Sequence, residues 1–406
     1  MAWLEIVDIA QAPRDAAQLD GAHVDLPCPG DRVETAAVPV QGWVAGRKAP
    51  AVRVEVVADG AICGSIPVGL VRTDVAAHLP ACAWAGRSGF SGQVDLLGLR
   101  VSQFQLQATL TDGGRTPLGT VTVRPTWPEG RHPDEQGVVS VIIPCFNQAH
   151  FLGDAIESAL AQTYAAVDAV VVDDGSTDNT IEIAARYGRV RYVRQENQGL
   201  AAARNTGLRR SVGEYVVFLD ADDRLRPDAI AVNVAFLRER PACAFVYGDY
   251  RHIRMDGSPA AERMRSAVGD EGYVALLRGN YIGMHATVLY RRAVFREVGT
   301  FDESVDACAD YDLFLRIARR FPIAGHGHPV ADYRLHHASM SADPQKMLRV
   351  SLAVLRGQRR FIGHDPRRRA AYKEGLRFVG WYYGELMRAR GTPPARWRAL
   401  WRQLFS

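Results

Sequence analysis

The stretches SVIIPCFN (140–147) and VVDDGSTD (171–178) each place polar residues directly after a short apolar run. Two further runs of this kind, at 190–193 and 215–219, follow along the chain. Short, largely apolar runs are typical of strands buried on both faces of a parallel sheet. Helical patterns lie between the first three runs, at 151–162 and 177–187. This alternation predicts a doubly wound α/β domain.

Carboxylates gather at the ends of these predicted strands. Asp173, Asp174 and Asp178 follow the second strand, and DADD (220–223) follows the fourth. Ligands of such sheets bind beyond the carboxyl ends of the strands. Clustered carboxylates repel one another unless a cation compensates their charge. A divalent metal that bridges to a diphosphate would do so.

Each motif also has a simpler interpretation. DGSTD (174–178) is often a turn followed by a helix cap, and DADD alone could be a solvated loop. Their joint occurrence after two strands of one sheet favours a ligand site. No GxGxxG follows the first strand, which excludes the usual dinucleotide site. A sugar-phosphate nucleotidyltransferase would need a glycine-rich basic loop where this chain has PCFN (144–147).

Together with GLAAARN (199–205) and FLDADD (218–223), these motifs resemble the family 2 glycosyltransferases of GT-A fold in both order and spacing. The resemblance runs from about residue 138 to residue 341, about half of the chain. It implies an α/β GT-A domain, the Rossmann-like fold of nucleotide-diphospho-sugar transferases. It also implies transfer of a sugar from a nucleotide-sugar donor with inversion of the anomeric configuration.

The resemblance implies donor contacts in three of the motifs. Phe146 matches a position that packs on the nucleotide base, with Pro144 and Asn147 in the same donor-binding loop. Asp174 matches a carboxylate that accepts from a pyrimidine ring N–H. Arg204 matches a basic residue near the nucleotide.

The DxD signature implies a metal site. Asp222 would bind Mg²⁺ or Mn²⁺ that bridges the diphosphate, and Asp220 would face the ribose or the waters of the metal. Asp223 is a weaker candidate. A bridging metal neutralises charge on the departing nucleoside diphosphate.

ADYDLFLR (309–316) resembles the family's segment that supplies the catalytic base, and the match gives that role to Asp310. Ala309 replaces the usual Glu, which places the contact normally made there in question. The alternative is that Asp310 and Asp312 only open a helix. The two roles are compatible.

YRLHHASMS (333–341) resembles the family's closing segment, in which Arg334 and His336 approach the diphosphate or metal. His337 has no assigned role. GTFDE (299–303) is interpreted as a structural turn before the helix that carries the base. The stretch GNYIGMH (279–285) is expected on the acceptor side.

The other regions of the chain have no such resemblance. Residues 1–125 alternate apolar and polar side chains, as in 52–56 and 104–110, and predict an antiparallel β-sandwich accessory domain. Trp43, Trp84 and Phe90 are either a sugar platform or core, and spacing or oligomerisation is an equal alternative to glycan binding. Residues 126–137 are predicted to be a linker between this domain and the glycosyltransferase domain, 138–341.

Residues 342–406 are predicted to be a basic helical region. Trp397, Leu400, Trp401, Leu404 and Phe405 recur at helical spacing among Arg residues. This pattern suits a helix on an anionic membrane surface, and packing on the catalytic domain or on a second subunit is the alternative.

Composition limits the partners and the compartment. Lys+Arg 49 against Asp+Glu 45 gives a formal charge of +4, too small over 406 residues to indicate nucleic-acid binding. The six cysteines form no CxxC pair, so neither a zinc site nor a disulfide framework is expected. With no signal-peptide or membrane-spanning pattern, the expected location is cytoplasmic, with peripheral contact at the inner face of the plasma membrane as a hypothesis.

We therefore expect a metal-dependent glycosyltransferase of hexosyltransferase type, with UDP as the expected donor nucleotide. The acceptor would be a hydroxyl of a glycan or lipid-linked glycan in cell-surface polysaccharide synthesis. The alternative is a non-catalytic nucleotide-sugar-binding or assembly subunit, which Ala309 and the large accessory regions motivate.

Overall fold

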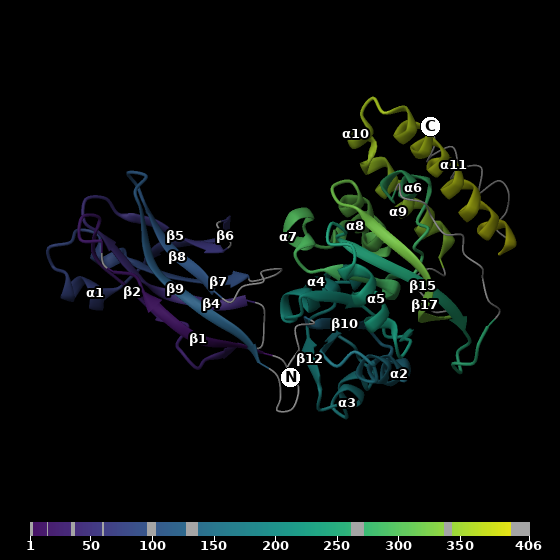
Figure 1. Cartoon of the computed structure of the whole chain (residues 1–406), viewed down its shortest axis with the longest axis horizontal. Coiled ribbons are helices and arrows are strands. Elements are labelled where there is room, and N and C mark those ends of the chain that lie inside the picture. The colour runs from purple at the N-terminus through teal and green to yellow at the C-terminus, as the bar shows by residue number, and fades with distance from the viewer. Residues whose placement is uncertain are drawn as a thin grey trace. The chain divides into compact units, whose positions relative to one another are not determined.

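A computed structural model describes residues 3–13, 15–33, 37–58, 61–95, 103–126, 137–260, 272–336 and 343–390, with the elements labelled in Figure 1. The chain forms two compact units, one containing residues 1–134 and 209–214 and the other residues 135–208 and 215–406. The predicted linker lies outside the described residues except at its ends, Thr126 and Gly137.

The first unit is built from antiparallel strands. They hydrogen-bond in the order β2-β4-β7-β6-β5-β8-β9-β1-β3. Alternate side chains, such as Val54, Val56 and Leu106, face one apolar core. A unit built mainly from antiparallel strands agrees with the predicted all-β class, and its packing as a two-sheet sandwich stays a prediction. The strands are β1 (Trp3–Gln11), β2 (Leu19–Leu26), β3 (Arg32–Val33), β4 (Ala37–Gly46), β5 (Ala51–Ala58), β6 (Ala61–Leu70), β7 (Gly89–Asp95), β8 (Gln103–Leu110) and β9 (Arg115–Thr126).

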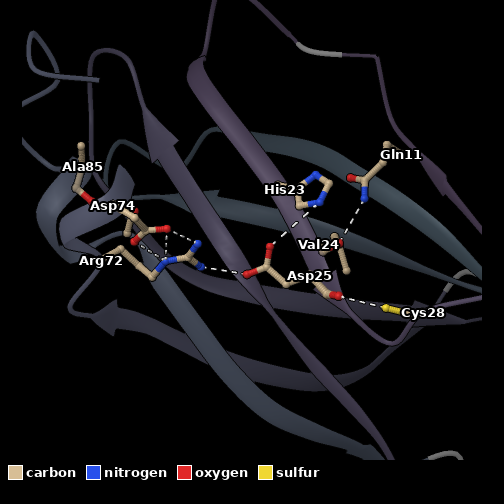
Figure 2. Close-up of polar contacts among 9 residues, drawn as sticks. Gln11, His23, Val24, Asp25, Cys28, Arg72, Asp74 and Ala85 are labelled. Carbon is tan, nitrogen blue, oxygen red and sulfur yellow. Dashed lines mark hydrogen bonds and ion pairs between the residues drawn. The ribbon is translucent and has the colours of Figure 1, made fainter. Parts of the chain in front are cut away.

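The first unit also contains two short helical elements that the sequence pattern did not predict. These are α1 (Thr73–His78) and the 3₁₀ turn η1 (Ala85–Arg87), both between β6 and β7. Figure 2 shows Arg72 donating to Asp74 of α1 and, over 2.8 Å, to Asp25 of β2. Arg72 thus ties the start of α1 to the edge of the sheet. Six residues are too few to show a helical period in sequence.

The three aromatic residues considered as a sugar platform in the first unit do not share one environment. Phe90 is fully buried in the core, Trp43 is half-buried, and Trp84 is exposed. Phe90 is therefore a core residue, and a platform built from all three is wrong.

The second unit contains the predicted α/β domain. Its strand order is β12-β11-β10-β13-β16-β15-β17-β14, and the first four strands are parallel. Each of the four predicted strands is present, with boundaries within two residues of those expected. The strands are β10 (Val139–Cys145), β11 (Val167–Asp173), β12 (Val190–Arg194), β13 (Tyr215–Phe218), β14 (Arg224–Leu225), β15 (Phe245–Ile253), β16 (Val288–Arg291) and β17 (Ile323–Arg334).

Helices cover both faces of this sheet. Apolar residues of α2 and α5 share a core with alternate residues of β10, such as Val141 and Ile143. On the other face α4 lies so close to β10 that a Cβ atom at Gly207 would be 2.2 Å from Ile142 Cγ2. The helical elements are α2 (Ala149–Leu160), α3 (Thr180–Ala184), α4 (Leu200–Arg210), α5 (Ala229–Arg238), α6 (Gly272–Arg278), η2 (His285–Thr287), α7 (Val294–Val298), η3 (Glu303–Cys308), α8 (Ala309–Ala318), α9 (Pro344–Gly357), α10 (Arg359–Ile362) and α11 (Pro366–Ala389).

The C-terminal helices pack within the second unit, where α11 lies against α6 and α9, and α9 lies against η3. The predicted aromatic stripe at 397–405 lies outside the described residues. Among the helices that the structure describes, none has the length and apolarity needed to cross a membrane.

Candidate active site

The loops after β10 and β11 are joined by their polar side chains. The backbone N–H of Asn147 donates to Ser176 Oγ over 3.0 Å, and Thr177 N–H donates to Asn147 Oδ1 over 2.8 Å. Asp178 accepts from the N–H of Ala149 at the start of α2. The DGSTD segment therefore forms a turn, caps the start of α2 through Asp178, and also borders the candidate site. Because these residues bond the neighbouring loop, the helix predicted at 177–187 begins later and is shorter, at Thr180–Ala184.

Asp174 organises the loop after β12. Its buried carboxylate accepts from Gln195 Nε2 over 2.7 Å and from the backbone N–H groups of Gln198 and Gly199 over 3.0 and 2.9 Å. An open cleft of about 490 Å³ lies at this loop, lined by Gly175, Arg194, Gln195, Glu196 and Asn197. Asp174 therefore shapes one wall of the cleft, while its predicted contact with a base stays a prediction.

The loop after β10 presents an aromatic side chain to solvent. Phe146 is 47% exposed although it lies between the ends of buried strands. Pro144 is buried inside β10, and Asn147 has a left-handed backbone with φ of 53°. Because asparagine tolerates this conformation, the chain can turn sharply into α2. The turn leaves the Phe146 ring available to a flat ligand.

The three aspartates after β13 have different surroundings. Asp220 Oδ1 accepts from Arg204 over 2.7 Å, and Asp222 Oδ2 lies 2.8 Å from Nε2 of His336. Asp223 is buried, and desolvation together with the charges of Asp222 and Asp220 raises its pKa well above its usual range. The loop therefore carries more negative charge than its surroundings compensate.

This loop fits a divalent cation shared with a diphosphate. Within the residues that the structure describes, no three His, Cys, Asp or Glu side chains converge as a complete metal cage. Mg²⁺ at phosphate sites takes only one or two protein carboxylates and fills its shell with water and phosphate oxygens. Asp222 and Asp220 match that ligand set, and their two charges next to the buried Asp223 are what a cation would offset.

Asp310 lies in the first turn of α8, close to Arg204 and Asp220. Its Oδ1 accepts from the N–H of Tyr311 over 2.7 Å. Burial raises the pKa of Asp310, and the nearby charge of Asp220 adds to this, while the guanidinium of Arg204 opposes the increase. Arg204 is itself buried, and its Nε finds no acceptor among the described residues. Asp310 is thus a buried carboxylate that faces both a guanidinium and a second carboxylate.

Two contacts hold α4 against the segment that leads into α8. Asn205 donates to the carbonyl of Phe301 over 3.0 Å and accepts from its N–H over 2.9 Å. Asp306 accepts from the N–H of Ala201 over 2.7 Å at the start of α4. Because Arg204 adjoins Asn205, these contacts set its position beside Asp310.

Comparison with known proteins identifies the family. The model of the family described as glycosyl transferase family 2 matches residues 140–299. A putative teichuronic acid biosynthesis glycosyltransferase, TuaG of Bacillus subtilis, is 30% identical over 226 residues, which are 54% of this chain and 87% of that protein. The chain belongs to the family 2 glycosyltransferases.

Other family 2 relatives are matched over part of their length. An uncharacterized glycosyltransferase of Rickettsia felis is 36% identical over 200 residues, 46% of this chain and 32% of that protein. Chondroitin synthase of Escherichia coli is 32% identical over 189 residues, 46% of this chain and 27% of that protein. The chain thus spans about a third of the length of these relatives. The crystal structure of S. aureus TarS 1-349 has 21% identity and a TM-score of 0.47, covering 59% of this chain and 70% of that chain.

In this family 2 glycosyltransferase, Arg334 supports the DADD loop. Its buried guanidinium donates to the backbone carbonyl of Asp222 over 2.8 Å, to the carbonyl of Met255 over 2.6 Å and to Asp154 over 2.7 Å. Its backbone N–H also donates to Asp223. The approach of Arg334 to a diphosphate stays a prediction. His336 contacts Asp222 directly, and His337 lies outside the described residues.

Asp312 has a structural role beside Asp310. It pairs with Arg316 over 2.6 Å, and Arg316 donates to the carbonyls of Val298 and Thr300. This confirms the predicted turn before the base-bearing helix. Both aspartates lie in the first turn of α8, as the alternative expects, and Asp310 also lies near Arg204 and Asp220, so its role as a base stays a prediction.

Sequence reasoning missed several residues of this site. Gln195 and Gln198 follow β12 directly, so the rule that polar residues after a strand reach the site could have found them. Asp154 in α2 and Asp306 in η3 carried no local signal, because their partners lie 180 and 105 residues away.

Proposed function

We propose that this protein is an inverting, metal-dependent glycosyltransferase that moves a sugar from a nucleotide diphosphate to a hydroxyl of a glycan. The observation that carries the proposal is the buried Asp310 beside the Arg204–Asp220 pair, in a chain of this family. The names of two relatives, which refer to teichuronic acid and chondroitin, support a role in cell-surface polysaccharide synthesis. A glycan or lipid-linked glycan is the proposed acceptor, and the cytoplasm the proposed location.

The donor would lie across the ends of β10, β11 and β13. Phe146 offers its exposed ring to the base. The loop that follows Asp174 borders the cleft lined by Gly175 and Gln195. Pro144 and Asn147 shape the loop that carries Phe146. A UDP sugar is the proposed donor, because an acceptor such as the Asp174 carboxylate suits a ring N–H of uracil.

Asp222, with Asp220, would hold Mg²⁺ or Mn²⁺, which when bound neutralises charge on the departing diphosphate. Asp310 accepts the proton of the acceptor hydroxyl as its oxygen attacks the anomeric carbon. The bond from that carbon to the diphosphate oxygen breaks, and the nucleoside diphosphate leaves. Attack from the side opposite the leaving group inverts the anomeric configuration.

Thermal unfolding in the presence of Mn²⁺ and single nucleotide sugars tests the donor. A ligand that binds only the folded state stabilises it by about 2.7 kcal/mol at a hundred times its dissociation constant. We expect UDP sugars to raise the Tm more than GDP, ADP or CDP sugars do. If no nucleotide sugar raised the Tm above that of the ligand-free protein, a nucleotide-sugar site would be excluded. A larger rise with another base would exclude uridine.

The effect of Arg204 on Asp310 gives a pH-dependent prediction. The guanidinium opposes the rise in the pKa of Asp310, so Arg204→Gln should raise that pKa further. Because the base acts only when deprotonated, activity is lost below this pKa. The acid limb of kcat/KM should therefore move to higher pH in Arg204→Gln, as measured between about pH 5 and pH 9. Arg186→Gln, at an exposed arginine beyond α3, serves as the control, and an unchanged acid limb in Arg204→Gln would contradict the assignment.

A non-catalytic nucleotide-sugar-binding or assembly subunit is the second candidate, favoured by Ala309 in place of the usual Glu. Such a subunit would bind the donor and release no nucleoside diphosphate. Turnover of the unmodified protein therefore separates the two candidates.

A further inference from the structure

Helix α11 carries exposed aromatic side chains on one face. Phe378 is 47% exposed and Trp381 is 56% exposed, and Tyr382 is half-buried beside them. The ring centroids lie 6.1 Å apart for Phe378 and Trp381 and 5.8 Å apart for Phe378 and Tyr382. These three residues, called the aromatic patch below, belong to α11, the helix at the upper right of Figure 1.

The stripe of α11 that adjoins Phe378 and Tyr382 is already used for packing. Ala371, Gly375, Val379 and Met387 are buried, and α11 lies against α6 and α9. A Cβ atom at Gly375 would be 1.9 Å from the carbonyl oxygen of Leu277, so the helix is seated closely on the end of α6. The aromatic patch is therefore held outward by a firmly docked helix.

The C-terminal helices, which include the one that carries the aromatic patch, are strongly basic. Residues 344–389 contain eleven Lys and Arg against three Asp and Glu. Lys373 and Arg377 are exposed within two turns of Trp381. Glu374, also exposed, is paired with Arg278 over 2.9 Å, so its negative charge is largely offset. An exposed aromatic surface with a positive rim is complementary to a negatively charged interface.

We propose that this face of α11 binds the surface of an anionic phospholipid bilayer. The aromatic rings would enter the interfacial region, where amphipathic rings are favoured, and the Lys and Arg side chains would contact the headgroup phosphates. The proposal does not depend on the transferase activity, and it concerns α11, not residues 392–406.

One contact links this face to the stretch expected on the acceptor side. A Cβ atom at Gly279 would be 3.1 Å from Phe378 Cδ1, so the aromatic patch begins where the 279–285 stretch begins. Docking of α11 on a bilayer would therefore bring that stretch close to the lipid surface.

Vesicle flotation of the full chain tests the proposal without any nucleotide sugar. We expect the protein to float with phosphatidylcholine–phosphatidylglycerol vesicles and much less with phosphatidylcholine alone. Phe378→Ser/Trp381→Ser should lower partitioning about tenfold. Lys373→Gln/Arg377→Gln should also lower it about tenfold, and added salt should weaken the binding of the unmodified protein.

Matched variants keep the result interpretable. Ile62→Ser/Trp84→Ser removes two comparably exposed apolar side chains from the first unit and should leave flotation unchanged. Thermal unfolding should show that every variant is folded. The proposal is overturned by the absence of flotation with anionic vesicles, or by wild-type flotation in both α11 variants. Loss of flotation in Trp397→Ser/Trp401→Ser with wild-type flotation in the α11 variants would place the contact in the following segment instead.

Discussion

Asp310→Asn is expected to lower kcat by about 10²- to 10⁴-fold, the usual contribution of a general base, while donor affinity changes little. Asparagine keeps the shape and the contact with Tyr311 N–H but cannot take a proton from the acceptor. Nucleoside diphosphate release measures kcat, and calorimetric titration of the nucleotide sugar with Mn²⁺ measures donor binding. The combination separates a catalytic role from a folding role.

Asp312→Asn is the matched control, two residues away on the same helix. It weakens the ion pair with Arg316, which holds the carbonyls of Val298 and Thr300. This variant should therefore lose stability and keep most of its turnover. Wild-type turnover in Asp310→Asn would remove that residue from the mechanism.

Asp222→Ala should lower kcat/KM by about a thousandfold and abolish the response to Mn²⁺. A metal at the diphosphate supplies several kcal/mol of stabilisation to the leaving group, and about 1.36 kcal/mol corresponds to tenfold in rate. The variant also removes the partner of His336, so donor binding with and without Mn²⁺ should be measured beside activity.

A second Asp–His pair with the same oxygen-to-nitrogen distance, Asp228 and His328, provides a control for Asp222→Ala. Asp228 Oδ2, at the start of α5, lies 2.8 Å from Nε2 of His328, and both side chains are partly exposed. Asp228→Ala should leave both kcat/KM and the Mn²⁺ response unchanged. An Asp222→Ala protein that keeps its full Mn²⁺-dependent activity would refute the metal assignment.

The sheet of the second unit could be predicted because its strands are buried on both faces. The apolar runs at 138–143 and 167–172 therefore differ clearly from the amphipathic helix between them. These two runs form β10 and β11. The placement of the Asp174 and Asp222 loops at one edge of the sheet follows from parallel topology, since β11 and β13 both run parallel to β10. The short α1 could not be predicted, because contacts of Arg72 rather than a helical period define its place.

The neighbours of the site residues could not be predicted in the same way. The family resemblance implied a place for Asp174 beside the nucleotide sugar, but the three N–H groups that donate to its carboxylate come from the loop after β12. Arg334 was expected at the diphosphate, yet its acceptors Asp154 and Met255 come from other elements. Such partners depend on how distant segments pack, and a motif describes only its own segment.

The central claim is transfer from a nucleotide sugar at a metal-dependent site, and nucleoside diphosphate release tests it most directly. The purified chain should release the diphosphate from a UDP sugar in the presence of Mn²⁺ and a glycan acceptor. Release should stop when EDTA removes the metal and resume when Mn²⁺ is restored in excess. Release that continues at the same rate in EDTA, or no release from any nucleotide sugar, would contradict the account.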